Sequence, residues 1–345
     1  MKKISVGILG ATGMVGQQTL RLLENHPWFK VSYLAASEAS SGKTYEKAVQ
    51  GRWHFAEPLP SSTAQLPVFA LHEMEEAKKN CQILFSCLTT ESALEWEEKY
   101  AKEGFAILSN ASCHRLNPQV PLIIPEINPD HLSILPQGKG FIIAKPNCSI
   151  QCMMLPLFPL HQQFQIRKIL ITTLQSVSGA GFPGVSSLTI TDNVIPHIPG
   201  EEEKSEIEPL KIFGKVEGRS IIPTKEIKIS AHCNRVPVLD GHLACLSVAF
   251  EKKPKKEEIL TLWKDFKGLD LPSAPKQPVV YLEEQDRPQP RLDRHQGKGM
   301  AISVGRLREC PLFDYRFTSL SHNTIRGAGG GSILTAELLV QKKIL

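Results

Sequence analysis

The chain has 345 residues, of which 41% are apolar and 22% charged, and it carries a formal net charge of +5. This length suits two domains, and this balance is typical of a globular protein with a sizeable core. The small charge, without a stripe of basic and aromatic side chains, argues against nucleic-acid binding, and no apolar run reaches the roughly 18 residues of a membrane span. Because the chain enters a strand almost at once, it leaves no room for a signal peptide, and we expect a cytoplasmic protein without a membrane partner.

The cysteines show no metal-binding spacing. No two of them form a Cys-x-x-Cys pair, and none stands at zinc spacing from a histidine. We therefore predict free thiols, several of them buried in strands, and no bound metal. The cysteines are Cys81, Cys87, Cys113, Cys148, Cys152, Cys233, Cys245 and Cys310.

Apolar strands alternate with helical segments in the first half of the chain. Strands are predicted at 3–9, 31–36, 83–88, 105–109 and 141–144, and helices at 14–24 and 91–102. Near-continuous apolar strands between helices predict a parallel sheet covered on both faces, and hence an α/β, Rossmann-type cofactor domain. The stretch 51–67 has several prolines and little periodicity, and we interpret it as an excursion.

A glycine-rich turn joins the first strand to the first helix. Gly10, Gly13 and Gly16 permit a tight turn, close approach of the backbone to a pyrophosphate, and close helix–strand packing. The helix N-terminus adds unpaired N–H groups and a partial positive charge for the anion. A plain turn is the alternative, but this position after an amino-terminal strand favours a dinucleotide site. The predicted cofactor contacts are Gly10, Thr12, Gly13, Met14, Val15 and Gly16.

The end of the second strand bears on the choice between NAD and NADP. An acidic residue there would hold a ribose hydroxyl and repel a 2′-phosphate. Ser37, Ser40 and Lys43 instead offer hydroxyls and a cation, which favours NADP, although Glu38 weakens the argument. A serine-rich surface loop is the alternative interpretation.

The second half of the chain shows a different pattern. Long, partly alternating strands are predicted at 168–177, 226–236, 242–250, 300–306 and 313–320. They predict an α+β domain with a mostly antiparallel sheet that has one covered face. An uncovered face needs a partner surface, so we expect a homodimer or homotetramer. The tail, 327–343, is glycine-rich and then helical, and its apolar stripe is best buried by a return to the first domain.

These patterns predict two domains. Residues 1–147 and 323–345 form the cofactor domain, and residues 148–322 form the catalytic and dimerisation domain. The boundary falls beside the most reactive group that we can identify, Cys148.

Cys148 follows a strand and a Pro146-Asn147 turn and opens an apolar helical stretch. A thiolate at a helix N-terminus is stabilised by the helix dipole, so we expect a lowered pKa and a nucleophilic sulfur. Asn147 and nearby backbone N–H groups could form an oxyanion hole. Taken alone, Cys148 fits a buried structural cysteine better. Pro156 and Pro159 predict that the helix kinks or ends near Leu155.

A histidine and an arginine later in the chain complete this chemistry. His242 opens a strand after a turn, and such a histidine can reach a distant cysteine and act as its base. Arg235, seven residues earlier, could clamp a carboxylate with two hydrogen bonds. Read by itself, His242 is an ordinary turn residue.

The combination resembles the aspartate-semialdehyde dehydrogenase family, and its archaeal and fungal branch in particular, over essentially the whole chain. The family's nucleophile motif is matched by Asn147-Cys148-Ser149, and a glutamine in the next long strand by Gln175. The arginine that holds the substrate carboxylate and the catalytic histidine are matched by Arg235 and His242.

The resemblance also implies substrate and nicotinamide contacts. A Glu-x-x-Lys segment for the substrate amine and phosphate is matched by Glu201 and Lys204, although Glu202 and Glu203 fit almost as well. A second phosphate-binding arginine is matched by Arg115, which alone would be a surface residue. The nicotinamide-side loop and tail are matched by Ser178, Gly179 and Asn323.

The resemblance implies reductive dephosphorylation of L-aspartyl 4-phosphate to L-aspartate 4-semialdehyde by NADPH through a Cys148 thioester, a step of lysine, diaminopimelate, threonine and methionine biosynthesis. His242 would help deprotonate the thiol. A related rival is N-acetyl-glutamyl-phosphate reductase, whose neutral nitrogen gives no reason for Glu201. A non-catalytic NADP sensor would not need Cys148, Gln175 and His242. A short-chain reductase would need a Tyr-x-x-x-Lys pair, which none of the five tyrosines provides.

Overall fold

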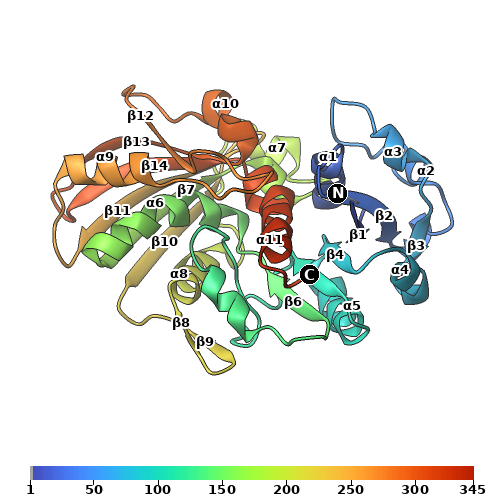
Figure 1. Cartoon of the computed structure of the whole chain (residues 1–345). Coiled ribbons are helices and arrows are strands. Elements are labelled where there is room, and N and C mark those ends of the chain that lie inside the picture. The colour runs from blue at the N-terminus through green and yellow to red at the C-terminus, as the bar shows by residue number, and fades with distance from the viewer. Residues whose placement is uncertain (1–2) are drawn as a thin grey trace.

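A computed structural model describes residues 3–345 and contains two large sheets (Figure 1). The first sheet is wholly parallel, with the order β3-β2-β1-β4-β5-β6. This is the strand order of a Rossmann-type dinucleotide-binding sheet. Its strands are β1 (Ile4–Leu9), β2 (Phe29–Ala36), β3 (Val68–Ala70), β4 (Ile83–Ser86), β5 (Ala106–Ser109) and β6 (Phe141–Ala144).

Helices cover both faces of this sheet, and the prediction of an α/β domain is confirmed. The sequence pattern missed β3, a three-residue strand that pairs with the end of β2 at the sheet edge. Three residues are too few to show a period. The helices and helical turns of this half are α1 (Met14–Leu23), η1 (Glu38–Ser40), α2 (Tyr45–Ala48), α3 (Ser61–Ala64), α4 (Met74–Asn80), α5 (Thr90–Lys102) and η2 (Pro129–Ile134).

The second sheet is mixed, with the order β10-β7-β11-β14-β13-β12. The three inner pairings are antiparallel, whereas β10 and β12 lie parallel to their neighbours at the two edges. Its strands are β7 (Ile166–Gln175), β10 (Lys228–Arg235), β11 (His242–Phe250), β12 (Val279–Leu282), β13 (Ile302–Glu309) and β14 (Tyr315–Ser321). A small separate hairpin is formed by β8 (Lys215–Glu217) and β9 (Ser220–Ile222).

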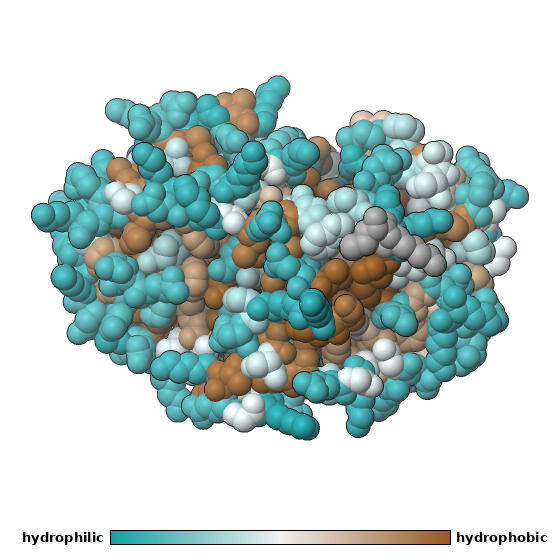
Figure 2. Space-filling model, in the orientation of Figure 1, coloured by the Kyte–Doolittle hydropathy of each residue, from teal (hydrophilic) through white to brown (hydrophobic). Residues whose placement is uncertain are grey.

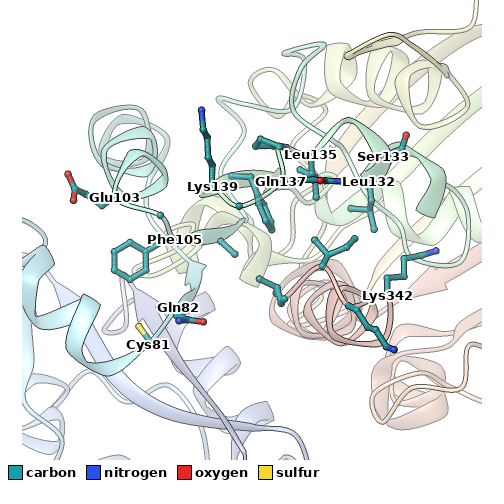
Figure 3. A pocket seen from close by; sticks show the side chains of 18 of the residues that line it. Cys81, Gln82, Glu103, Phe105, Leu132, Ser133, Leu135, Gln137, Lys139 and Lys342 are labelled. Atoms are coloured by element: carbon teal, nitrogen blue, oxygen red, sulfur yellow. The ribbon is translucent and has the colours of Figure 1, made fainter.

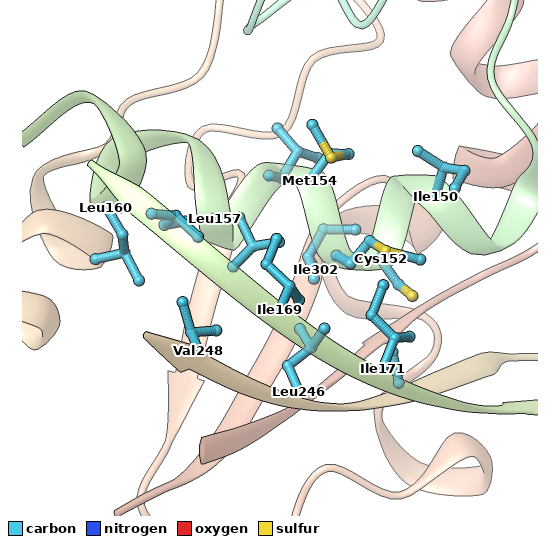
Figure 4. Packing of buried hydrophobic residues seen from close by; sticks show 14 of the residues in the cluster. Ile150, Cys152, Met154, Leu157, Leu160, Ile169, Ile171, Leu246, Val248 and Ile302 are labelled. Atoms are coloured by element: carbon cyan, nitrogen blue, oxygen red, sulfur yellow. The ribbon is translucent and has the colours of Figure 1, made fainter. Parts of the chain in front are cut away.

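Helix α6 (Cys148–Phe164) lies on this sheet, and its buried side chains contribute a large part of the hydrophobic core of this half of the chain. Figure 4 shows Met154, Leu157 and Leu160 of α6 lying over Ile169 of β7 and Val248 of β11. The other helical segments of this half are η3 (Val177–Ala180), α7 (Ser187–Ile190), α8 (Glu201–Ile212), α9 (Lys256–Asp265), α10 (Pro290–Asp293) and η4 (Gln296–Gly299).

We expected α6 to kink or to end near Leu155, and the early end is wrong, because the helix continues through Pro156 and Pro159 to Phe164. Each proline lacks an N–H group and costs the helix one internal hydrogen bond. Burial compensates for that loss, since nearly all side chains from Ser149 to Leu160 are buried. The Trp263 indole also donates to the Pro156 carbonyl oxygen at 2.9 Å.

The tail packs back against the first sheet through η5 (Ile325–Gly329) and α11 (Gly330–Gln341) (Figure 1). Helix α11 is apolar on every side, and its residues from Gly330 to Leu339 are all buried. Ile333, Leu334 and Leu338 share a core with residues of β1 and β2. The division into residues 1–147 with 323–345 and residues 148–322 stays a prediction.

Most side chains on the face drawn in Figure 2 are hydrophilic, with hydrophobic ones gathered near its middle. Within residues 3–345, no helix combines the length and the apolar character that crossing a membrane requires.

Candidate active site

Cys148 is the first residue of α6 and directly follows the turn after β6. Its Sγ atom lies 3.2 Å from Nε2 of His242, the first residue of β11. The sequence separates these residues by 94 positions, and the stacking of α6 on the second sheet brings them together. The two residues form the pair that a cysteine nucleophile requires.

Hydrogen bonds to the other ring nitrogen fix the tautomer of His242. Nδ1 accepts from the backbone N–H of Ser176 at 3.1 Å, and Ser176 Oγ lies at the same distance. A neutral imidazole whose Nδ1 accepts carries its proton on Nε2. Burial, with Arg235 and His322 nearby, lowers the pKa of His242 to about 3. His242 is therefore neutral and donates Nε2–H to the sulfur.

The expectation of a lowered pKa for the Cys148 thiol is not met in the structure. Burial, and then the Glu201 carboxylate, raise the pKa of the Cys148 thiol above its ordinary value. The cations Lys145, Arg115 and Arg235 act in the opposite direction. Desolvation outweighs the helix terminus here because the thiolate would lose its water.

Glu201 is the centre of a buried hydrogen-bond network beside Cys148. Its carboxylate accepts from Asn147 Nδ2 at 2.9 Å, Gln175 Nε2 at 3.1 Å and Lys204 Nζ at 2.9 Å. It begins α8 after Gly200, which has a φ of 69°, so the acidic stretch forms a helix start and not a solvated turn. Glu202 instead accepts from the backbone N–H of Cys233, and Glu203 is exposed.

The donors of Asn147 are engaged. Its side chain accepts from the N–H and hydroxyl of Ser149 and so caps α6. Its backbone N–H donates to Glu208 Oε2 at 2.7 Å, and its amide nitrogen donates to Glu201. Through these contacts Asn147 positions the helix start that carries Cys148 and the carboxylate of Glu201. None of them points to an oxyanion hole.

Arg235 and Gly179 lie against His242. The Arg235 guanidinium donates to the Ser176 carbonyl oxygen at 2.8 Å and is almost fully buried. A Cβ atom at Gly179 would come within 2.8 Å of both Arg235 Nη1 and His242 Cε1. Position 179 therefore accepts only glycine without displacing one of these two side chains.

Replacing Gly179 with alanine should lower turnover by on the order of 100-fold, because the methyl group displaces His242 or Arg235 by a fraction of an ångström to an ångström. Steady-state kinetics of the variant measure the effect. The matched control is Ala180→Ser, in the same exposed loop, which should retain activity. Wild-type turnover in Gly179→Ala would contradict this assignment.

Arg115 lies in the loop after β5, where the sequence analysis predicted an anion contact. It is buried, and its guanidinium donates to Glu208 Oε1 and to the Asn110 carbonyl oxygen, each at 2.9 Å. Its Nε–H has no partner among the described residues. A buried unpaired donor is costly, and an arriving anion would satisfy it.

One acidic cluster behind this loop has metal-ligand chemistry that the cysteine spacing did not reveal. Glu97, Cys113 and His114 bring one ligand atom each within 4.8 Å of one another. His114 Nε2 and Glu97 Oε2 are 3.3 Å apart. Both side chains are buried, and we infer that this contact fixes the Arg115 loop.

The glycine turn has the shape that a bound dinucleotide requires. Gly10 has a φ of 75°, and a Cβ there would lie 2.6 Å from the Cys87 carbonyl oxygen. A Cβ at Gly16 would lie 2.3 Å from the Gly10 carbonyl oxygen. Gly13 caps α1 without a side-chain hydrogen bond, so the first N–H groups of the helix are not capped by a side chain. Thr12, Met14 and Val15 lie on this turn.

The loop after β2 gathers hydroxyls and cations. Ser40 is buried, and Arg52 Nη2 lies 3.4 Å from its Oγ atom, whereas Lys43 donates to the Ala39 carbonyl oxygen. Ser37 caps the turn η1. Glu38 pairs with His72 at 3.0 Å. Sequence reasoning missed Arg52 because it falls in the aperiodic excursion.

The predicted nicotinamide-side residues meet across the two halves of the chain. Asn323 Nδ2 donates to Ser178 Oγ at 2.8 Å, and its Oδ1 accepts from the Gly241 N–H at 2.8 Å. The turn before β11 and the loop after β7 are thus joined to the tail.

A large surface hollow lies elsewhere. It is lined by residues that follow α4 and α5, by η2 and by the last residues of the chain (Figure 3). Leu135, Lys139 and Lys342 border it. None of the predicted site residues lines it, so it is not the reaction site.

Two family models match the chain. Semialdehyde dehydrogenase, NAD binding domain, matches residues 5–135, and Semialdehyde dehydrogenase, dimerisation domain, matches residues 157–326. The aspartate-semialdehyde dehydrogenase of Archaeoglobus fulgidus is 45% identical over 99% of this chain and 100% of its own length. That of Saccharomyces cerevisiae is 44% identical over 100% and 99% of the two chains.

Solved structures give the same result. The crystal structure of aspartate semialdehyde dehydrogenase with NADP from Candida albicans superposes with a TM-score of 0.92 at 40% identity, covering 99% of this chain and 100% of that one. Aspartate semialdehyde dehydrogenase II from Vibrio cholerae, complexed with ASA, superposes with a TM-score of 0.80 at 26% identity over 99% of both chains.

Proposed function

The chain belongs to the aspartate-semialdehyde dehydrogenase family, and from this premise we propose which of its residues carry the reaction. It catalyses the NADPH-dependent reductive dephosphorylation of L-aspartyl 4-phosphate to L-aspartate 4-semialdehyde, a step of amino-acid biosynthesis. The family resemblance and the NADP cofactor predicted from the sequence are confirmed.

The nucleophile is Cys148. The main observation that supports this assignment is the contact of 3.2 Å between its Sγ and His242 Nε2. Cys148 also lies at the start of a helix and beside two buried arginines. The Cys148 thiol releases its proton to water, the thiolate attacks the acyl carbon, phosphate leaves, and a thioester forms on Sγ. A thioester accepts hydride more readily than a carboxylate does, which splits one difficult step into two. When bound, the nicotinamide cofactor supplies that hydride.

His242 acts chiefly as a hydrogen-bond donor in this assignment. Its Nε2–H first stabilises the thiolate and then donates toward the oxygen that becomes the aldehyde. The role implied by the family resemblance, as the base that deprotonates Cys148, stays a prediction, and it requires the tautomer in which Nε2 accepts a hydrogen bond from the thiol.

The substrate is held by groups of complementary charge. We assign the carboxylate to Arg235, the phosphate to Arg115 and Lys204, and the ammonium to Glu201. Buried arginines suit anions, all the more because Arg115 has an unpaired Nε–H, and a buried carboxylate suits an ammonium. Gln175 and Asn147 orient Glu201.

The cofactor contacts follow from the shape of the glycine turn. Side chains at Gly10 and Gly16 would meet backbone within 3 Å, so the turn holds its backbone close to a pyrophosphate at the end of α1. Ser37, Ser40 and Lys43, with Arg52 nearby, suit a 2′-phosphate, and Ser178, Gly179 and Asn323 suit the nicotinamide end.

Glu201→Gln should have opposite effects on the thiol and on turnover. The Glu201 charge raises the pKa of Cys148, so its removal should speed alkylation of Cys148 at neutral pH by on the order of tenfold. Turnover should fall because the substrate ammonium loses its partner. Alkylation is followed on the Cys148 peptide by mass spectrometry. Glu203→Gln, on the exposed neighbour, serves as the control and should change neither rate. Slower alkylation in Glu201→Gln would contradict the assignment.

One assay tests the substrate. The protein is given L-aspartate 4-semialdehyde, phosphate and NADP, and the absorbance of NADPH is followed. Higher kcat/KM with N-acetyl-glutamate semialdehyde would overturn the assignment of Glu201 to an ammonium. A parallel run with NAD tests the roles of Ser37, Ser40 and Lys43.

We propose that the second sheet joins two copies of the chain. Side chains alternate in burial along its strands, and Lys168, Ser230 and Cys245 are exposed on the outward face. Light scattering should give a multiple of the 38.3 kDa chain mass, as a homodimer or homotetramer. A monomer mass would reject this proposal.

A further inference from the structure

Lys145 is a buried lysine for which the proposed reaction has no role. It lies between β6 and α6, three residues before Cys148, and is 5% exposed. Its Nζ donates to the carbonyl oxygens of Pro146 and Gly327. The neighbouring buried cations differ, since Arg115 and Arg326 each pair with a carboxylate.

These two hydrogen bonds hold the backbone around the nucleophile. Pro146 belongs to the turn that presents Cys148, and Gly327 belongs to η5 of the tail. Gly327 lies so close to the nucleophile that an added Cβ would be 2.9 Å from Cys148 Cβ. Lys145 therefore joins the two backbone segments that enclose Cys148 on this side.

A buried thiolate also needs a positive charge nearby. The imidazole of His242 is neutral and contributes a dipole only. In the proposed function, the charges of Arg235 and Arg115 face the substrate carboxylate and phosphate, which neutralise them. Lys145 is the neighbouring cation to which the proposed function assigns no substrate anion.

We propose that Lys145 is a positioning residue of the reaction, which ties the Cys148 turn to Gly327 and keeps a buried ammonium beside the thiolate when the arginines are occupied by substrate. This inference rests on the proposed role of Cys148 as the nucleophile. The proposed function itself gives Lys145 no part in the reaction.

The charges of the two groups depend on each other. Burial, and then Arg115, lower the pKa of Lys145 to about 7, while the Cys148 charge raises it. Lys145 in turn lowers the pKa of Cys148. Each group thus favours the charged form of the other near neutral pH. The other charged or titratable groups that face the pair are Cys87, Arg115, Cys152, Glu201, Glu208, Arg235, His242 and Arg326.

The test is the pH dependence of Cys148 alkylation by iodoacetamide, measured on the Cys148 peptide in the full-length protein without substrate. Lys145→Gln retains a donor for the Gly327 carbonyl but loses the charge. In this variant the midpoint of the alkylation rate against pH should move to higher pH, and alkylation at pH 7 should slow by about tenfold. Lys145→Arg retains the charge and should keep the midpoint of the wild type, even where its melting temperature falls.

A second buried lysine provides the control. Lys211 is 2% exposed and donates to three carbonyl oxygens, those of Arg115, Asn117 and Val120, but it is not among the groups that shift the pKa of Cys148. Lys211→Gln should leave the alkylation midpoint unchanged. An unchanged midpoint in Lys145→Gln, or an equal shift in Lys211→Gln, would overturn the proposal. Because no substrate is present, these outcomes do not depend on the identity of the aldehyde.

Discussion

Cys148→Ala should lower the rate of NADPH formation from aspartate semialdehyde by on the order of 10⁴-fold or more, because the variant cannot form a thioester. The nearest alternative thiol is Cys152, one turn along α6, which is fully buried and donates to the Ser149 carbonyl oxygen at 2.9 Å. It has no route to the substrate. The melting temperature should stay close to that of the wild type, since only one sulfur atom is lost.

Cys310 provides the matched control for this experiment. Partial burial opposes ionisation, but hydrogen bonds from the backbone of Leu312 and Phe313 lower the pKa of the Cys310 thiol. Cys310 is therefore an easily ionised cysteine that directly follows β13, and it lies beside Asp314 and Val248, at the end of β11 opposite to His242. Cys310→Ala should retain full activity. Activity that survives Cys148→Ala would contradict the mechanism.

Arg326→Met should destabilise the protein by about 3–5 kcal/mol and lower its melting temperature by on the order of 10 °C. Arg326 is fully buried and binds Glu126 through two hydrogen bonds, Nη1 to Oε1 at 2.7 Å and Nη2 to Oε2 at 2.6 Å. The substitution leaves the Glu126 carboxylate buried without a counter-charge. Because Arg326 adjoins Gly327, it also loosens the backbone behind Cys148.

A substitution at an exposed arginine tests whether the loss of any ion pair would reduce stability as much. Arg167 contacts Glu251 at 2.7 Å and Glu226 at 3.2 Å, with 35% of its side chain exposed. Arg167→Met should cost less than about 1 kcal/mol, because solvent screens such pairs. Calorimetric melting of both variants gives the comparison. Equal losses of stability would show that burial of the Arg326 pair is not the cause.

Much of the cofactor domain could be predicted from the sequence because its signals are local. The strands at 3–9 and 141–144 are continuous apolar runs, and the glycine turn needs only ten consecutive residues. The period of the strands and the turn chemistry are therefore visible without knowledge of the fold. The family comparisons confirm the resulting fold class.

The catalytic network was less accessible to sequence reasoning because its contacts span the chain. The family resemblance named Cys148, Glu201 and His242, but their electrostatics depend on burial that only the fold reveals. The Ser176 N–H decides the tautomer of His242, and no spacing in the sequence indicates that contact. Burial, and then the charge of Glu201, likewise reverse the expected direction of the Cys148 pKa shift.

Packing also overrode a local rule in α6. Two prolines predicted a kink or an early end of the helix, and the sheet beneath it supplied enough burial to continue it to Phe164. Lys145 shows the reverse case. A lysine after an apolar strand has the pattern of a surface residue, and only the returning tail buries it.

The most direct test of the central claim is a single-turnover experiment without phosphate. Wild-type protein is mixed with excess aspartate semialdehyde and NADP, NADPH is measured rapidly, and the quenched protein is analysed by mass spectrometry. We expect a burst of about one NADPH per chain and an aspartyl thioester on the peptide that contains Cys148, since no acceptor is present to release it. Added phosphate should restore turnover. A burst without an adduct, or an adduct on another cysteine, would contradict the assignment of Cys148 as the nucleophile.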